Sequence, residues 1–384
     1  MYQVPLIEKA KEMGLEVHVC SQKGNYPGID IAPFFYEIDI SDKKNIFSLA
    51  KRLNIDGILT TATDVCLESI GHVVNELNLS GTGLEDSKAC LDKNLMKQRF
   101  IHNGVPTPNY LKVNNLQDAI KFFNKRSKSC VLKPTDSSGS RGVTKVECIS
   151  EIEFAFNEAF KFSKTKNIII EEWLEGEEFG AQAVVIDNEL ALLILHSDIT
   201  TTPPHRIPIG HGCPHPKEST LYPLTLEIVN KAIIALGVNN VVCNIDFIQS
   251  STGPQIIEMT CRMGGTRLPE VCGEYWGVNF YELAVKLSLG IKPEIPLIPT
   301  GLPNAAHNLN LTTFGIIEKF GKMNKDFEWK LTFNEGEKVS INAANQIDIG
   351  YVHVKGADAQ TVLTDATFAA QKFCNTIAMR EVDK

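Results

Sequence analysis

A lysine at the end of an apolar strand, followed by a loop of small residues, is the first pattern in this sequence that suggests chemistry. Val131 and Leu132 lead into Lys133, and residues 134–143 read Pro-Thr-Asp-Ser-Ser-Gly-Ser-Arg-Gly-Val. Backbone N–H groups of such a loop can wrap a polyphosphate, because glycine and serine let the chain approach closely, and Lys133 adds a positive charge. For this loop alone a surface hairpin is the alternative, and the Walker A pattern is absent.

A second pattern joins two strands through an acidic hinge. Residues 168–179 read Ile-Ile-Ile-Glu-Glu-Trp-Leu-Glu-Gly-Glu-Glu-Phe, so a buried strand ends in polar residues and then restarts. Glu171 can accept a hydrogen bond from an adenine amine, and Glu178 can accept from ribose hydroxyls. Trp173 and Leu174 offer apolar cover for a base. Taken alone, this stretch is more simply an acidic, solvated turn.

A third pattern places two carboxylates twelve positions apart, at Asp246 and Glu258. The even spacing suits two adjacent antiparallel strands that present both carboxylates on one face. Hard oxygen ligands of this kind suit Mg²⁺ held together with substrate phosphates. Arg262 follows in a loop softened by two glycines, where it can meet a phosphoryl group. The alternative is an ordinary exposed acidic pair on a hairpin.

The three patterns occur in the order of the ATP-grasp superfamily. The chain resembles its branch of carboxylate–amine ligases, which includes proteins similar to L-amino acid ligases and carbamoyl-phosphate-synthase-like proteins. The resemblance covers most of the chain up to the proline-rich segment at 291–303 and takes in Asp92-Lys93, where the family commonly has a lysine that contacts ATP phosphates. Thr260 stands where the family usually has asparagine, and its hydroxyl can also coordinate a hard cation.

Carried over by position, the resemblance implies ATP and Mg²⁺ (or Mn²⁺) as cofactors and Arg262 beside the transferring phosphoryl group. The implied binding residues are Lys93, Lys133 and the lid residues Ser137, Ser138, Gly139, Ser140 and Gly142 for phosphates; Glu171, Trp173 and Leu174 for adenine; Glu178 for ribose; and Asp246, Glu258 and Thr260 for metal.

A loop rich in proline and histidine is expected from Asp198 to Lys217. His211 and His215 flank Cys213 and can be read as zinc ligands, but no further clustered ligand is visible. Because similar proteins carry a Gly-His-x-x-Pro turn near the acceptor pocket, we favour a substrate-site role for His211. Arg206 is a second candidate there, and His196 is more simply a structural histidine.

Composition narrows the class of protein. The net charge of −8 over 384 residues argues against nucleic acid as the main partner. The ten cysteines form no C-x-x-C pair, which favours free thiols in a reducing cytosol. No apolar run approaches the roughly 20 residues needed to span a bilayer, and the first residues do not resemble a signal peptide. We therefore expect a cytoplasmic enzyme without a membrane partner.

The elements that must position these residues begin with alternating β and α patterns, which predict a parallel sheet. The chain opens on a helical pattern where such a domain normally has a strand, so either this strand is absent or the true start lies upstream. The predicted strands of this region are 17–20, 35–38 and 57–60, and its predicted helices are 42–53, capped by Asp42, and 65–77.

Further along, Ser87 is expected to cap a helix at 87–103, and Ser150 with Glu153 to form a capping box. Another helix is predicted at 219–236, and a linker at 291–303. The predicted strands are 130–133, 143–147, 168–172, 179–186, 190–196, 241–249 and 255–259.

The expected fold class is α/β and α+β. An N-terminal parallel α/β domain (1–88) precedes an ATP-grasp fold (89–298), whose two α+β subdomains clasp ATP and whose lid subdomain spans about 106–178. A small C-terminal α+β domain (299–384) completes the chain.

The function expected from the resemblance is an ADP-forming ligase that activates a carboxylate as an acyl phosphate and joins it to an amine. Its partners would be small-molecule carboxylate and amine substrates, with a homodimer left open. One alternative is a carboxylating or carbamoyl-phosphate-type enzyme that uses bicarbonate. Another is a nucleotide-binding protein without catalysis. A third, a zinc hydrolase built on His211 and His215, is disfavoured because the sequence offers no third zinc ligand with suitable spacing.

Overall fold

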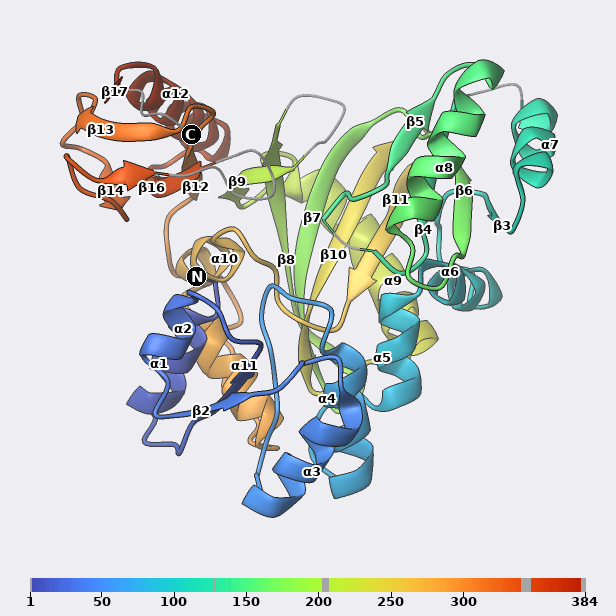
Figure 1. The fold of residues 1–384 in the computed structure, drawn as a ribbon, viewed down its shortest axis with the longest axis horizontal. Coiled ribbons are helices and arrows are strands. Elements are labelled where there is room, and N and C mark those ends of the chain that lie inside the picture. Colours follow the sequence, from blue (N-terminus) through green and yellow to red (C-terminus); the bar gives the residue numbers. More distant parts are fainter. Residues whose placement is uncertain (1, 127–128, 138, 202–206, 340–346, 381–384) are drawn as a thin grey trace.

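The computed structural model describes residues 2–126, 129–137, 139–201, 207–339 and 347–380 (Figure 1). The predicted site residues Ser138 and Arg206 lie outside these ranges. Among the helices described, none is both long and apolar enough to cross a membrane.

The first part of the chain builds a small α/β unit around one pair of parallel strands. The predicted cap of α3 is confirmed, since Asp42 accepts hydrogen bonds from the N–H groups of Lys44 and Asn45. The strand expected at 57–60 is not formed, because this extended segment pairs only at Thr61, which makes a single parallel bridge with Met263. The elements are α1 (Val4–Glu12), β1 (His18–Ser21), α2 (Pro27–Asp30), β2 (Phe34–Glu37), α3 (Lys43–Leu53) and α4 (Leu67–Leu77).

Two helices replace the single helix predicted at 87–103. They are α5 (Leu84–Leu91) and α6 (Lys93–His102), and the break between them is at Asp92. The Asp92 carboxylate caps α6 by accepting from the N–H groups of Asn94 and Leu95. The predicted cap, Ser87, lies inside α5 and is buried. Because Asp92 caps α6, the helix breaks there, and Lys93 at the start of α6 is buried.

A four-stranded antiparallel sheet with two helices forms the next unit. Its order is β3–β6–β4–β5. The capping box is formed by Cys148 and Glu151, not by the predicted Ser150 and Glu153. The elements are β3 (Tyr110–Val113), α7 (Leu116–Arg126), β4 (Cys130–Pro134), β5 (Thr144–Val146), a 3₁₀ turn (Ile149–Glu151), α8 (Ile152–Phe162) and β6 (Ile168–Glu172).

An antiparallel sheet of eight strands, in the order β11–β10–β7–β8–β9–β12–β16–β14, forms the centre of the molecule (Figure 1). Helices α5, α6 and α9 cover one face, whereas α10 and α11 cover part of the other. The central elements are β7 (Glu177–Ile186), β8 (Glu189–Thr200), β9 (Pro208–Cys213), α9 (Glu218–Leu236), β10 (Val241–Ser250), β11 (Gly253–Thr260), α10 (Leu268–Trp276) and α11 (Phe280–Ser288).

Part of the loop predicted from Asp198 to Lys217 is strand: residues 198–200 end β8, and Pro208–Cys213 form β9. Residue Asp198 belongs to β8, and β9 pairs with β8 on one side and with β12 on the other. Strand β9 is not recognisable from the sequence, because it contains two glycines where other strands have large apolar residues. A Cβ on Gly210 would lie 2.6 Å from the Ala306 carbonyl oxygen, so the close approach of the strands requires this glycine.

The C-terminal residues continue the same sheet. Strands β12, β16 and β14 extend it beyond β9, and α12 packs on β12 and β16 around a separate core. A three-stranded sheet, β15–β13–β17, lies beside them. The elements are β12 (Asn304–Leu311), β13 (Gly315–Lys319), β14 (Glu328–Leu331), β15 (Lys338–Val339), β16 (Ile347–Lys355), α12 (Ala359–Asn375) and β17 (Ala378–Arg380).

Candidate active site

One cross-strand row of the central sheet carries the main candidate residues. Glu258 on β11 is paired with Asp246 on β10, which is paired with Gly180 on β7, which is paired with His196 on β8. Directly paired residues project to the same face of a sheet. The prediction that Asp246 and Glu258 lie on one face of two antiparallel strands is thus confirmed. His196 belongs to the same row, and Gly180, which has no side chain, separates it from Asp246.

Asp246 has an environment that favours the neutral carboxyl group. Its side chain is exposed, yet desolvation by the surrounding protein and the charges of Asp198 and Glu258 raise its pKa. Asn244 donates to its carboxylate at 2.9 Å. Nearby, the buried hydroxyl of Thr260 has no hydrogen-bond partner among the described residues. A divalent cation beside Asp246, Glu258 and Thr260 would relieve both features, so these residues fit the implied metal.

Lys93 connects this row to the small-residue loop. Its ammonium group donates to Glu258 at 2.9 Å and to the backbone carbonyl of Ser137 at 2.9 Å. Burial is the largest effect and works against its charge, but Glu258, with Asp64 and Glu171, outweighs burial and raises the pKa of Lys93. In the described part of the loop, Gly139 and Gly142 have φ of +67° and +72°, which glycine adopts without strain. A fixed positive charge therefore lies between the acidic row and the small-residue loop at Ser137.

Lys133 lies in a buried ion-pair cluster with Glu171 and a lysine that the sequence analysis missed. The Glu171 carboxylate is 2.9 Å from the Lys133 ammonium and 3.4 Å from that of Lys97. Lys97 is fully buried, so desolvation lowers its pKa to about 8, and it also donates to Thr107. The side chain expected to face adenine is therefore already engaged by two lysines.

The hinge between the two larger sheets contains the remaining residues that were predicted to bind the nucleotide. Trp173 donates its backbone N–H to Ser129 at 3.0 Å, and the Lys145 ammonium lies 4.7 Å from the centre of its indole ring. Leu174 and Glu178 are half-buried. A Cβ on Gly176 would clash with the Gln249 carbonyl oxygen, so a glycine is needed where the chain crosses from β6 to β7.

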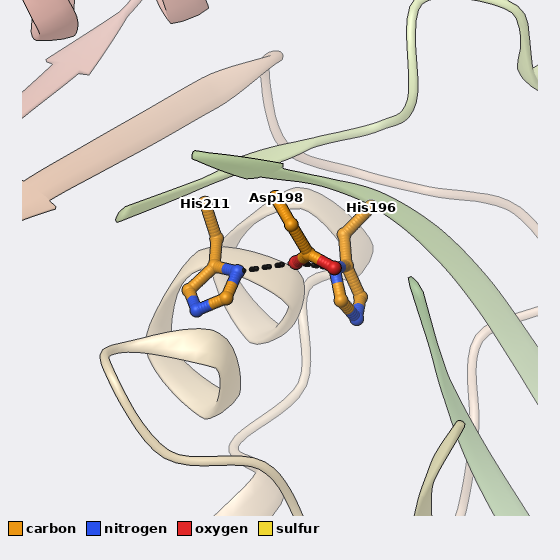
Figure 2. Close-up of side chains that lie close together, drawn as sticks. All are labelled: His196, Asp198 and His211. Atoms are coloured by element: carbon orange, nitrogen blue, oxygen red, sulfur yellow. Dashed lines mark hydrogen bonds and ion pairs between the residues drawn. The ribbon is translucent and has the colours of Figure 1, made fainter. Parts of the chain in front are cut away.

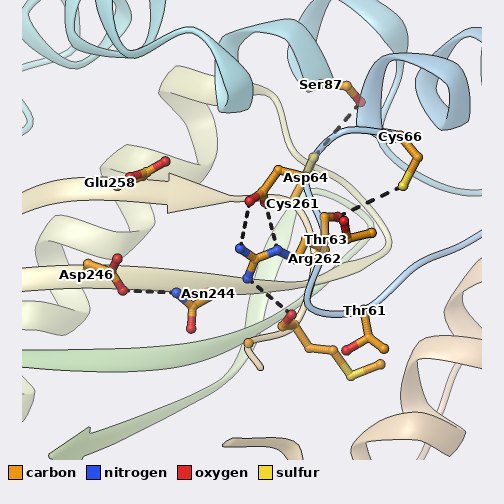
Figure 3. Close-up of polar contacts among 12 residues, drawn as sticks. Thr61, Thr63, Asp64, Cys66, Ser87, Asn244, Asp246, Glu258, Cys261 and Arg262 are labelled. Atoms are coloured by element: carbon orange, nitrogen blue, oxygen red, sulfur yellow. Dashed lines mark hydrogen bonds and ion pairs between the residues drawn. The ribbon is translucent and has the colours of Figure 1, made fainter. Parts of the chain in front are cut away.

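Arg262 is tied to the N-terminal unit. Its guanidinium donates through two nitrogens to the Asp64 carboxylate, at 2.8 and 3.1 Å (Figure 3). A bidentate pair of this kind fixes the plane of the guanidinium. Figure 3 shows the pair beside Asn244, Asp246 and Glu258. The arginine expected to meet a phosphoryl group thus lies near the carboxylates, but it is oriented by an aspartate from the first 88 residues.

Three side chains from β8 and β9 meet next to the row (Figure 2). The Asp198 carboxylate lies 3.0 Å from Nδ1 of His196 and 2.7 Å from Nδ1 of His211. His215 is elsewhere, with Glu177 at 3.6 Å, and the Cys213 thiol faces the Leu195 carbonyl. The zinc ligands considered from the sequence, His211 and His215, are therefore not brought together.

Sequence reasoning missed four residues of this region: Asp64, Lys97, Asp198 and Asn244. Only Asn244 had a local signal, since it stands two residues before Asp246 and alternation places both on one face. The others reach the site through contacts between segments far apart in sequence.

Residues 90–266 match the ATP-grasp domain family. An uncharacterized protein of Sinorhizobium fredii is 24% identical over 63% of this chain, which spans about half (50%) of that protein. Phosphoribosylglycinamide synthetase from Anaerococcus prevotii superimposes with a TM-score of 0.80 at 25% identity, over 99% of this chain and 97% of the other. L-amino acid ligase from Bacillus licheniformis has a TM-score of 0.81 at 18% identity, over 98% and 95% of the two chains.

Proposed function

Since residues 90–266 make this chain an ATP-grasp protein, we propose that it is an ATP-dependent ligase that activates a carboxylate as an acyl phosphate. An amine then captures the acyl phosphate, giving an amide, ADP and phosphate. Two proteins with the same fold, an L-amino acid ligase and a phosphoribosylglycinamide synthetase, support this class.

The observation that carries the proposal is the row formed by Asp246 and Glu258 with Lys93 beside it. A Mg²⁺ or Mn²⁺ ion held there by Asp246, Glu258 and Thr260 would neutralise charge on the phosphates. Lys93 already contacts both Glu258 and the loop at Ser137, so a nucleotide in the loop would meet this ammonium. Phosphoryl transfer needs positioning and charge neutralisation more than covalent help from the protein.

The other residues divide between the nucleotide and the acceptor. Lys133 would bind phosphate, and the hinge around Trp173 and Leu174 would bind the base through its backbone and apolar surface. Arg262, oriented by Asp64, would stabilise the transferring phosphoryl group. His211 would orient the acceptor, because it is bonded to Asp198, whose charge also acts on Asp246.

We also propose small-molecule carboxylate and amine partners, a cytoplasmic location and, as the assembly to examine first, a homodimer. Bicarbonate as the activated acid is the second candidate. Three cations act on Glu258 (Lys93, Lys133 and Arg262), and they favour bicarbonate because it requires only a small basic site. A non-catalytic nucleotide-binding protein would have no need for the carboxylate row.

The experiment is a phosphate-release screen with Mg·ATP over amino acids, small carboxylates and bicarbonate, alone and in pairs with amines. We expect release that requires both a carboxylate and an amine and that is abolished in Glu258→Gln with the fold retained. Release with bicarbonate alone would select the second candidate. A well-folded Glu258→Gln protein with near-normal turnover would refute the metal assignment, and no release under any condition would leave only nucleotide binding.

A further inference from the structure

The cluster of His196, Asp198 and His211 is not explained by nucleotide binding. Asp198 and His211 are cross-strand partners in β8 and β9, and His196 lies two residues before Asp198 on the same face. One ligand atom from each of the three residues lies within 4.8 Å of the others. Figure 2 shows the carboxylate between the two imidazole rings. From this geometry we propose that the three side chains form a binding site for a divalent transition-metal ion such as Zn²⁺.

The second observation is the unsatisfied state of the two imidazoles. His196 is 1% exposed, and within the described chain neither of its ring nitrogens has a hydrogen-bond partner. Its Nδ1 is close to Asp198 but not in hydrogen-bonding geometry. His211 is 2% exposed and is bonded only through Nδ1, which leaves Nε2 without a partner. Buried polar groups are normally satisfied, and a cation bound beside the carboxylate would supply the partner that His196 Nδ1 lacks.

The ligand chemistry distinguishes this site from the Mg²⁺ site. Two imidazole nitrogens and one carboxylate oxygen suit zinc and similar transition metals, whereas Asp246, Glu258 and Thr260 offer only oxygen. Three protein ligands also leave an open coordination position, as in catalytic rather than structural zinc sites. The two strands are hydrogen-bonded to each other, which keeps the ligands in register.

A hydrogen-bonded relay without metal is the competing interpretation. In a relay, Asp198 accepts a hydrogen bond from each imidazole, and this accounts for its contact with His211. It does not account for His196, which approaches Asp198 to 3.0 Å without forming such a bond. A metal ion needs only a ring nitrogen lone pair directed toward it, so an ion beside the carboxylate accounts for the approach of both Nδ1 atoms to Asp198.

The test uses the full chain, stripped with a chelator and equilibrated with Zn²⁺ in a large excess of Mg²⁺, which occupies the oxygen-ligand site. We expect about one tightly held zinc per chain by elemental analysis after gel filtration. The same titration with Co²⁺ should give visible absorption typical of nitrogen ligation. His196→Ala and Asp198→Asn should each weaken binding by more than about 100-fold, since even the loss of a residue that only hydrogen-bonds to a metal ligand costs about 10- to 100-fold.

Two matched variants make the result specific. His215→Gln removes a neighbouring buried histidine outside the cluster, and Glu258→Gln alters the Mg²⁺ site; both should keep the zinc. Wild-type protein that retains no zinc would overturn the proposal, and this measurement depends on no variant. Zinc that persists in His196→Ala and Asp198→Asn, or that is lost with Glu258→Gln, would overturn it equally. None of these readouts requires ligase activity, so they stand even if the proposed reaction is wrong.

Discussion

Gly180 and His196 are cross-strand partners, and the imidazole of His196 occupies the space where a side chain on residue 180 would project. The glycine thus lets a histidine lie over β7, between the carboxylate row and Asp198. A methyl group at this position must displace the ring or strain the strand.

We therefore expect Gly180→Ala to lower the free energy of unfolding by about 1–3 kcal/mol, the usual cost of overpacking. In a His196→Ala background the same change should cost less than about 0.5 kcal/mol, because the obstruction is gone. Urea denaturation of the four proteins measures the coupling. Gly28→Ala is the control, since the nearest atom there is the flexible end of Ile7. Equal costs in both backgrounds would disprove the steric relationship.

Lys133 should contribute to both stability and nucleotide binding. Lys133→Met leaves the buried Glu171 with only Lys97, and removing one partner of a buried pair costs on the order of 3 kcal/mol. Adding Glu171→Gln should restore most of this stability, but ATP affinity should remain low because the cation is still missing. Calorimetry and chemical denaturation separate the two effects. Unchanged ATP affinity in Lys133→Met would make the lysine purely structural.

His211→Gln should reduce phosphate release with the accepted substrates by roughly 10- to 100-fold, because small misplacements of a reacting group are costly. ATP affinity should remain near normal, because the hinge and the two lysines proposed to bind phosphate, Lys93 and Lys133, are unchanged. Paired calorimetry and turnover measure this, with His215→Gln as the matched control. If His211→Gln keeps full activity, His211 has no role on the acceptor side.

Glu218 provides a pH prediction away from the site. Burial raises its pKa from 4.5 to about 7. Between these values the unfolded chain has lost a proton that the folded protein retains, so stability falls as pH rises through this window. Glu218→Gln should therefore be neutral near pH 4 and stabilising at pH 8, on the order of 1 kcal/mol after allowance for partial exposure.

Thermal denaturation at the two pH values measures this difference. Glu227→Gln, on the exposed side of the same helix α9, is the control and should show no such gain at high pH. A Glu218→Gln protein that is no more stable than wild type at pH 8 would show that the carboxylate is already solvated.

The parts of the fold that were predictable from sequence are those set by local patterns. Alternation and spacing sufficed for β10 and β11 and for the pairing of Asp246 with Glu258, because a short hairpin fixes its own register. Strands β4, β6 and β7 were found because their apolar runs are continuous. The division of the chain near residues 88 and 298 stays a prediction.

What was missed depends on contacts across long stretches of sequence. Strand β9 has two glycines in place of an apolar run. These glycines are needed because Ala306 and Leu363 lie close to them, and no local pattern shows those contacts. Lys97 is on a helix face, where a solvated lysine is the normal expectation, and only the fold brings it to Glu171. Likewise, Asp64 meets Arg262 from a position 198 residues earlier, which no local pattern can indicate.

The pairing of β9 with β12 means that the last segment of the chain protects a vulnerable edge. If the chain stopped before Asn304, the N–H and C=O groups of β9 would be open along the strand that carries His211. An open edge of this kind is a template for adding foreign strands and hence for aggregation. The C-terminal residues therefore cover this edge of the sheet, and residues 1–303 expressed without them are expected to aggregate.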